Sequence, residues 1–332
     1  MAINLQLLTA FTVHPVQKQP RERYSHHDHV HADTSLNAIF TAIETASASV
    51  VGSDPDSPGK VNQDASFHFQ SSRFICGGVL DGHGKKGHIL NEFLVSYIPK
   101  ALKSRLLCEN DDAISIENIL IETFENAHYA ARMDESVPAG RSGTTCVVTV
   151  VDTKVGVIYT GIVGDSRAII AIKDDHSDWR VTPLSNETTT SRECERSRIE
   201  QHEGRIDSGG NVWYGPVGIA MTRALGDSVM KRAGVIPTPE VTCFDLNDEL
   251  DELNANFLLT ILMGSDGIFD VMSNEVANAF FQDTIDNGSS LEDGCSQLVE
   301  EARRKWQGGL PVEVRIDDAT IAALTFNYIT AF

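Results

Sequence analysis

The chain has 332 residues, 41% of them apolar, so it can bury a sizeable core as one large domain or two ordinary ones. Its 47 acidic and 27 basic side chains give a formal charge of −20, which argues against nucleic acid and anionic membranes as partners. The six cysteines include no CxxC pair, and no apolar run approaches the roughly 20 residues of a membrane helix. We therefore expect an intracellular protein of the cytoplasm or nucleus. We also expect it to be a monomer.

The N-terminal segment, residues 1–42, mixes Pro, Gln and basic residues without a sustained hydrophobic period. We expect a mobile tail there and a single folded domain over residues 43–332. The tail carries four closely spaced histidines, which could bind a metal ion or do no more than titrate: His26, His27, His29 and His31.

Short β-branched runs separated by turn signals begin at about residue 43 and predict seven strands. They are expected at 65–69, 74–80, 145–151, 155–162, 167–172, 257–263 and 319–326. Only the turn Asp152-Thr153-Lys154 separates the third run from the fourth, which predicts a hairpin and therefore antiparallel pairing.

Helical patterns fall between these strands and predict five helices. They are expected at about 86–107, 114–133, 192–203, 274–287 and 291–306. Ser273 is typical of a helix start, and the pair Asn287-Gly288 of a helix end. Helices grouped between blocks of strands indicate a layered α+β fold rather than a βαβ repeat.

Four aspartates lie at the ends of apolar strands. Asp81 follows one strand in VLDGHG, Asp165 another in VGDSRA and Asp266 a third in MGSDGIFD, while Asp317 precedes the last strand in RIDDAT. Carboxylate oxygens without His or Cys suit a hard cation, Mg²⁺ or Mn²⁺, better than zinc. Each aspartate alone could equally belong to an ordinary strand-end turn, but four together predict a metal site.

Eight motifs in a fixed order make the chain resemble the protein phosphatase 2C family over about residues 45–326. They are KVNQD (60–64), VLDGHG (79–84), SGTT (142–145), VGDSRA (163–168), MTRALGD (221–227), GVIPTPEV (234–241), SDGIFD (265–270) and DDAT (317–320). The resemblance is strongest to the branch with an Asn-Gln-Asp first motif found in plants and protists. It implies a central antiparallel β-sandwich flanked by helices on both faces, in four αββα layers, and a metal-dependent protein serine/threonine phosphatase.

The resemblance also implies the ligands of two Mg²⁺ or Mn²⁺ ions. Asp81 is similar to the carboxylate that bridges both ions, and the carbonyl of Gly82 to a ligand of one of them. Asp266 and Asp317 match ligands of the other ion. Asp64 resembles the acidic residue that supports the metal shell through water.

A third, weaker metal site and a general acid are implied in the same way. Asp165 and Asp270, with Asp266, match the third site, although the first two could simply belong to turns. His83 matches the general acid, which would protonate the leaving seryl or threonyl oxygen while a hydroxide bridging the two metals attacks phosphorus. The alternative for His83 is a structural histidine in a Gly-rich turn.

The sequence departs from the family pattern at the first motif and in the flap. Lys60 stands where an Arg is common, so it could bind substrate phosphate only as a point charge, or could be a solvated loop lysine. The stretch after Thr182 and the compact loop up to Trp213 suggest a reshaped flap. We interpret Arg223 and Asp227 as a packing and salt-bridge element beside the site.

Two other functions remain to be weighed. A catalytically dead member of the family could serve as a scaffold that binds other proteins, but the acidic set and His83 are complete. A kinase or ATPase is disfavoured because the chain has no GxxxxGK[ST] loop, HRD motif or Rossmann glycine pattern. We therefore expect phosphorylated proteins as substrates.

Overall fold

The computed structural model describes the chain except for residues 1–38, 108–114, 175–177, 250–255, 309–314 and 330–332. Residues 36–332 form one compact unit. The four tail histidines lie outside the described residues. The first strand begins at Ile39, so four residues assigned to the expected tail, 39–42, belong to the folded domain's sheet.

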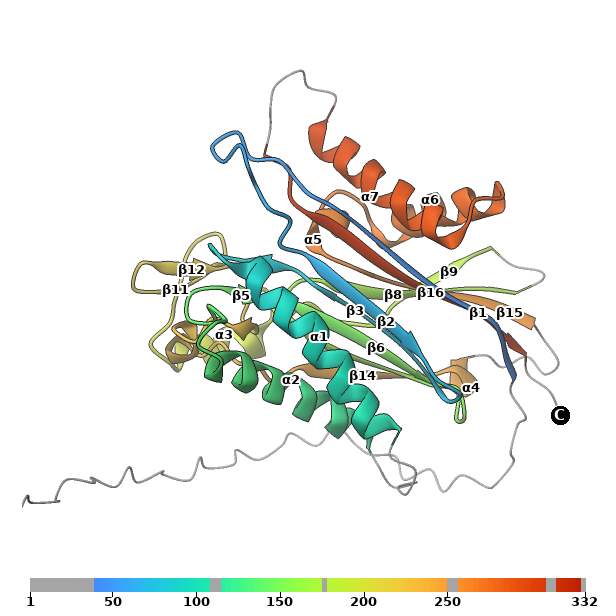
Figure 1. Cartoon of the computed structure of the whole chain (residues 1–332), viewed down its shortest axis with the longest axis horizontal. Helices are drawn as coiled ribbons and strands as arrows, with labels where there is room; N and C mark the ends of the chain where they lie inside the picture. Colours follow the sequence, from blue (N-terminus) through green and yellow to red (C-terminus); the bar gives the residue numbers. More distant parts are fainter. Residues whose placement is uncertain (1–38, 108–114, 175–177, 250–255, 309–314, 330–332) are drawn as a thin grey trace, which may run out of the picture. The chain divides into compact units, whose positions relative to one another are not determined.

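Two five-stranded antiparallel sheets form the centre of this unit (Figure 1). The first sheet has the order β1 (Ile39–Val50), β16 (Ala319–Ile329), β15 (Asn256–Gly264), β8 (Arg167–Asp174) and β9 (Arg180–Pro183). The second has the order β14 (Glu240–Asp245), β7 (Val157–Val163), β6 (Cys146–Asp152), β3 (Phe74–Leu80) and β2 (Ala65–Gln70).

The side chains of β3 show how the layers are built. Every residue of this strand is buried, because both faces of its sheet are covered. Ile75 and Val79 join the core shared with the first sheet, whereas Cys76 and Leu80 join the core under the helices. Successive residues of a strand point to opposite faces, so one apolar run serves two cores.

Helices cover the outer face of each sheet, as Figure 1 shows. The second sheet packs against α1 (Gly87–Leu106) and α2 (Ile116–Met133). The first packs against α6 (Asn274–Asp286) and α7 (Leu291–Gln307), with the short α5 (Asp266–Phe269) between sheet and helices. The expected α+β fold, an antiparallel sandwich between helical layers, is therefore confirmed.

Short elements build a flap and a bridge at one end of the sandwich. The flap has its own small apolar core and contains α3 (Glu193–Glu200), β10 (Arg205–Ile206), β11 (Val212–Tyr214), β12 (Val217–Ile219) and the 3-10 helix η1 (Met230–Ala233). The bridge is a three-stranded sheet of β13 (Leu225–Gly226), β5 (Gly143–Thr144) and β4 (Gly82–His83). The remaining helix is α4 (Leu246–Glu249).

The predicted elements agree with the structure to within about two residues at most ends. All seven strands and five helices are present, Ser273 caps α6 by accepting a hydrogen bond from Val276 N, and β6 pairs with β7 as a hairpin. The strands β1 and β14 and the flap hairpin were missed. The loop expected up to Trp213 is a small sheet, because Trp213 pairs with Gly218 and Arg205.

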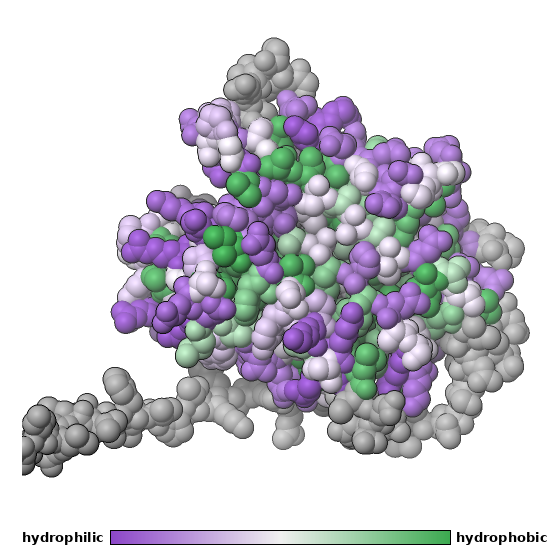
Figure 2. All heavy atoms as spheres, in the orientation of Figure 1, coloured by the Kyte–Doolittle hydropathy of each residue, from purple (hydrophilic) through white to green (hydrophobic). Residues whose placement is uncertain are grey.

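The surface is mostly hydrophilic on the face drawn in Figure 2, where apolar side chains form only small scattered patches. This distribution is ordinary for a domain that keeps its large apolar side chains between layers. No helix in the described part of the chain is long and apolar enough to cross a membrane.

The flap is held by Glu195, whose side chain is fully buried. Its carboxylate accepts hydrogen bonds from Arg198 Nη2 at 2.5 Å and Arg223 Nη2 at 2.6 Å. Burial alone would raise the pKa of Glu195, but the hydrogen bonds and charges of the two arginines outweigh it and hold the pKa well below its ordinary value.

We predict that Glu195→Ala lowers the free energy of unfolding by about 3–5 kcal/mol, because two half-buried guanidinium groups lose their counter-charge. Urea unfolding followed by circular dichroism measures the change. The control is Glu200→Ala, which removes an exposed carboxylate from the same helix and should change stability by less than about 0.5 kcal/mol. Equal effects of the two substitutions would contradict this account of the flap.

Candidate active site

The predicted acidic residues meet at one end of the sandwich. Asp81 joins β3 to β4, and its charge interacts with those of Asp64, Asp266 and Asp165. Asp266 in turn interacts with Asp317. These residues come from the ends of strands in both sheets, so the fold brings together carboxylates that lie up to 253 positions apart in the sequence.

Crowding and burial raise the pKa values of four of these carboxyl groups. Burial, followed by repulsion from its neighbours, raises the pKa of Asp81 well above its ordinary value. Burial likewise raises the pKa of Asp64 to about 7, that of Asp266 to about 7 and that of Asp165 to about 6. A positive charge close to these carboxyl groups would favour their ionised form and lower their pKa values.

Several carboxylate oxygens of the cluster have no hydrogen-bond partner, and a bound cation could coordinate them. One buried oxygen each of Asp64, Asp165 and Asp266 has no hydrogen-bond partner. Buried polar atoms almost always have partners, and three orphaned carboxylate oxygens in one place fit divalent cations with oxygen ligands. Within the described ranges, no three His, Cys, Asp or Glu side chains are already close enough to one point to hold a metal ion together.

The backbone around Gly82 is held by the first motif. Asn91 Nδ2 donates to the carbonyl oxygens of Gln63 at 2.7 Å and Leu80 at 3.3 Å. A Cβ atom on Gly82 would lie 2.5 Å from the Gln63 carbonyl oxygen, so only glycine fits. Thr145 completes the frame, because its N–H donates to the Asp81 carbonyl and its hydroxyl accepts from Asp81 N.

The two aspartates of the DDAT motif have different surroundings. Asp318 is buried and accepts from Gly52 N at 2.7 Å and Gln63 N at 2.9 Å. The Asp317 side chain is 48% exposed and interacts with Asp266, as expected for a residue that faces the acidic cluster. The role of Asp317 as a metal ligand stays a prediction, and Asp318 holds the first motif next to it.

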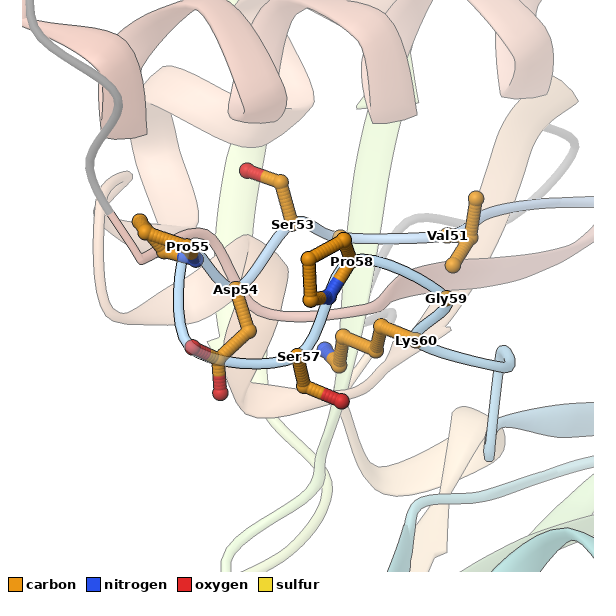
Figure 3. Close-up of a pocket in the computed structure, with 9 residues that line it drawn as sticks. Val51, Ser53, Asp54, Pro55, Ser57, Pro58, Gly59 and Lys60 are labelled. Carbon is orange, nitrogen blue, oxygen red and sulfur yellow. The ribbon is translucent and has the colours of Figure 1, made fainter.

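Lys60 lies close to the acidic cluster but is occupied by carboxylates. Its Nζ is 3.1 Å from Asp317 Oδ1 and 2.9 Å from Asp318 Oδ1, and its side chain is 17% exposed. The loop 51–60 lines a small hollow of about 360 Å³. Figure 3 shows the Lys60 side chain running back across the loop toward Ser57. Lys60 is thus a buried counter-charge, and its role in binding phosphate stays a prediction.

The third predicted metal site also has its carboxylates close together. Asp165 interacts with Asp270, and burial followed by the charge of Glu187 raises the pKa of Asp270. Arg167 lies beside them and donates to Glu187 Oε1 at 2.5 Å and to Asn274 Oδ1 at 2.9 Å. The charge of Arg167 partly offsets the repulsion at Asp270.

His83 is paired with Asp227, which the sequence analysis interpreted as part of a packing and salt-bridge element beside the site. His83 Nε2 lies 2.6 Å from Asp227 Oδ2. Burial would lower the pKa of His83, but the charge and hydrogen bond of Asp227 reverse the shift and raise it. A raised pKa keeps more of the imidazole protonated at neutral pH. Asp227 therefore forms an ion pair beside the acidic cluster, consistent with the salt-bridge interpretation, and the pairing makes it a direct neighbour of His83.

The bridge sheet explains how this pair is assembled. In that sheet β5 pairs with both β4 and β13, and Asp227 follows β13 with a positive φ of 45°. A Cβ atom on Gly143 would lie 1.9 Å from Asp227 Oδ2 and 2.5 Å from His83 Nε2. Gly143 of the SGTT motif is thus required for the contact. Arg223, by contrast, pairs with Glu195 as the packing interpretation predicted.

We predict that metal-free protein loses stability as the pH rises from about 4 to about 8, relative to an Asp81→Asn variant. The raised pKa values mean that the folded state favours protonated carboxyl groups, so their stabilising contribution is lost as the pH rises through about 6 to 7. Mn²⁺ at a hundred times its dissociation constant should add about 2.7 kcal/mol at pH 8 and less at pH 5.5, because its ligands must be ionised.

Melting temperatures with Mn²⁺ and with chelator, at both pH values, measure these effects. Asp81→Asn should remove most of the gain from Mn²⁺. A gain that is equal at both pH values, or unchanged in the variant, would show that metal binds elsewhere.

Comparison with known proteins gives the family. The family model described as Protein phosphatase 2C matches residues 62–307. The chain is 28% identical to Probable protein phosphatase 2C 61 of Arabidopsis thaliana, over 80% of this chain and 81% of that one. It is 32% identical to Protein phosphatase 1L of Bos taurus, over 63% of this chain but only 55% of that one.

Solved structures share the fold. The serine-threonine phosphatase 2C from Toxoplasma gondii superposes with a TM-score of 0.70 at 17% identity, covering 88% of this chain and 99% of that one. A sex determining protein of C. elegans superposes with a TM-score of 0.67 at 18% identity, covering 86% and 65%. With the family model spanning well over half of its length, the chain belongs to the protein phosphatase 2C family.

Proposed function

We propose that this protein is a metal-dependent phosphatase that hydrolyses phosphoserine and phosphothreonine in proteins. The observation that carries the proposal is the set of buried carboxylates with orphaned oxygens next to a histidine–aspartate pair. The names of the relatives, which are protein phosphatases, support the same reaction. Its first motif, Asn62-Gln63-Asp64, supports a place in the plant and protist branch of the family.

Asp81, Asp266, Asp317 and the carbonyl of Gly82 would hold two Mg²⁺ or Mn²⁺ ions, with Asp64 behind them. Ions bound there supply an activated water and neutralise charge on the phosphoryl oxygens. Asp64 is kept in place by Ser265, whose hydroxyl donates to Asp64 Oδ2 at 2.8 Å. Asp165 and Asp270, sharing Asp266, would hold a third ion more weakly, because Arg167 offsets part of their charge.

His83 would donate the proton that the leaving seryl or threonyl oxygen needs. Its side chain is 24% exposed, so a substrate can reach it, and Asp227 orients the ring from the buried side. The carboxylate also stabilises the protonated imidazole that acts as the acid. Lys60 would bind substrate phosphate as a point charge while keeping its ion pair with Asp317.

The proposed reaction predicts a requirement for metal ions. Purified protein should hydrolyse a phosphothreonine peptide with Mn²⁺ or Mg²⁺ and stop in excess chelator. Asp81→Asn should lower kcat/KM by about a hundredfold or more, because the metals supply several kcal/mol of transition-state stabilisation. Asp283→Asn, which alters an exposed carboxylate on α6, is the matched control and should behave as wild type. Undiminished turnover in chelator would refute the proposal.

The histidine–aspartate pair predicts a dependence on the leaving group. His83→Ala should slow hydrolysis of a phosphoserine peptide by about a hundredfold but slow an aryl phosphate far less, since an aryl oxide leaves without a proton. Asp227→Asn should show the same pattern at about tenfold, because the ring loses its orienting charge.

Asparagine tolerates the positive φ of residue 227, so Asp227→Asn should fold normally. Steady-state kinetics on both substrates provides the measurement. If either variant lost the same factor on the two substrates, the proton-donating role of His83 would be wrong.

A further inference from the structure

A groove of about 840 Å³ opens beside His83 and Asp227. Three segments line it: the turn after β4, residues 138–142 before β5, and residues 216–221 on and after the flap hairpin. Its volume is in the range of sites that bind small ligands or a few residues of peptide. Since one end of the groove contains the pair that would meet the leaving group, its remainder lies where the chain flanking a phosphorylated residue must pass.

The groove is basic in a strongly acidic protein. Lys85, Lys86 and Arg141 line it and are exposed. No ion pair within the described residues engages any of the three, whereas most other arginines near the site are paired with carboxylates. Three cations gathered without counter-charges in a chain of net charge −20 form a local field of the opposite sign.

The segments that carry these cations are fixed to one another. A Cβ atom on Gly84, whose φ is 81°, would lie 2.6 Å from the carbonyl oxygen of Arg141. Lys86 N donates to Ser142 Oγ at 3.1 Å. The cations therefore stand on a preformed frame, and little ordering of the backbone is needed when a ligand binds.

The part of the groove that the flap contributes is apolar and is also well supported. Val217, Ile219 and Met221 line it from the flap. Trp213 packs so closely under the hairpin that a Cβ atom on Gly218 would lie 2.7 Å from its ring. Trp213 Nε1 donates to Asp207 Oδ2 at 2.8 Å, which fixes the indole. A groove with one cationic and one apolar wall suits a peptide with acidic and apolar side chains.

We propose that this groove selects phosphoprotein segments with acidic residues close to the phosphorylated serine or threonine. The inference rests on the proposed phosphatase function and names its substrate class. His83 and Gly143 pair in the bridge sheet. Lys85 comes two residues after His83, and Arg141 two residues before Gly143. Each cationic residue therefore has its Cα atom within about 7 Å of the Cα atom of that paired residue. Acidic side chains within about three positions of the phosphorylated residue are therefore the ones recognised.

Two phosphothreonine peptides test the proposal, one with Glu and one with Lys at the three positions on each side of the phosphothreonine. Wild-type protein with Mn²⁺ should give a kcat/KM about tenfold or more higher for the Glu peptide, and the ratio should shrink as salt is added. Lys86→Glu and Arg141→Glu should each lower the ratio to about threefold or less. Taking the ratio within each variant cancels any change in the shared chemistry.

Lys100→Glu is the matched control. It makes the same charge change at an exposed position on α1, about 21 Å further along the helix than Lys86, and should leave the ratio unchanged. A ratio near one for wild type, or an equal effect of Lys100→Glu and Lys86→Glu, would overturn the proposal.

Direct binding separates this inference from the proposed function. Fluorescence anisotropy with the two labelled peptides measures affinity whether or not they are hydrolysed. Tighter binding of the Glu peptide that is lost in Arg141→Glu supports the groove even if turnover fails. Hydrolysis of an aryl phosphate without any preference between the peptides, in binding or turnover, refutes the groove and leaves the proposed function standing.

Discussion

The fold depends on how it accommodates several buried carboxylates at one end of its sandwich. Asp64, Asp81 and Asp266 come from both sheets and repel one another where water cannot screen them. Lys60 neutralises only the side of the cluster that includes Asp317 and Asp318. Divalent cations at the orphaned oxygens would complete the site, so that binding energy and fold stability are coupled.

The same end of the sandwich also contains the histidine–aspartate pair. The three-stranded bridge sheet places His83 in contact with Asp227, which lies 144 positions later in the chain. A side chain at position 143 would clash with both groups, so Gly143 leaves them room to meet, and the positive φ of Asp227 helps to direct its carboxylate at the ring. The flap extends from this sheet, which places the cationic groove next to the proposed proton donor.

Long apolar strands and their terminal aspartates could be predicted from the sequence because their signals are local. β3 and β8 begin at the predicted residues, and α1 differs by one residue at each end. β1 was missed because the alternation of Ala46, Ala48 and Val50 with serines is carried by small residues, and its bulge at Ala42 interrupts the pattern. The partner of Asp227 could not be predicted because His83 is distant in the chain, so no local pattern reveals the contact.

Anomalous X-ray diffraction from crystals grown with Mn²⁺ tests the metal centre most directly. The account predicts two strong anomalous peaks about 3.5–4 Å apart, in contact with Asp81, Asp266 and Asp317, and a weaker one near Asp165 and Asp270. Crystals of Asp81→Asn should lose the paired peaks and keep the fold. Peaks only on other acidic surfaces, or none beside Asp81 at saturating Mn²⁺, would contradict a two-metal centre at this end of the sandwich.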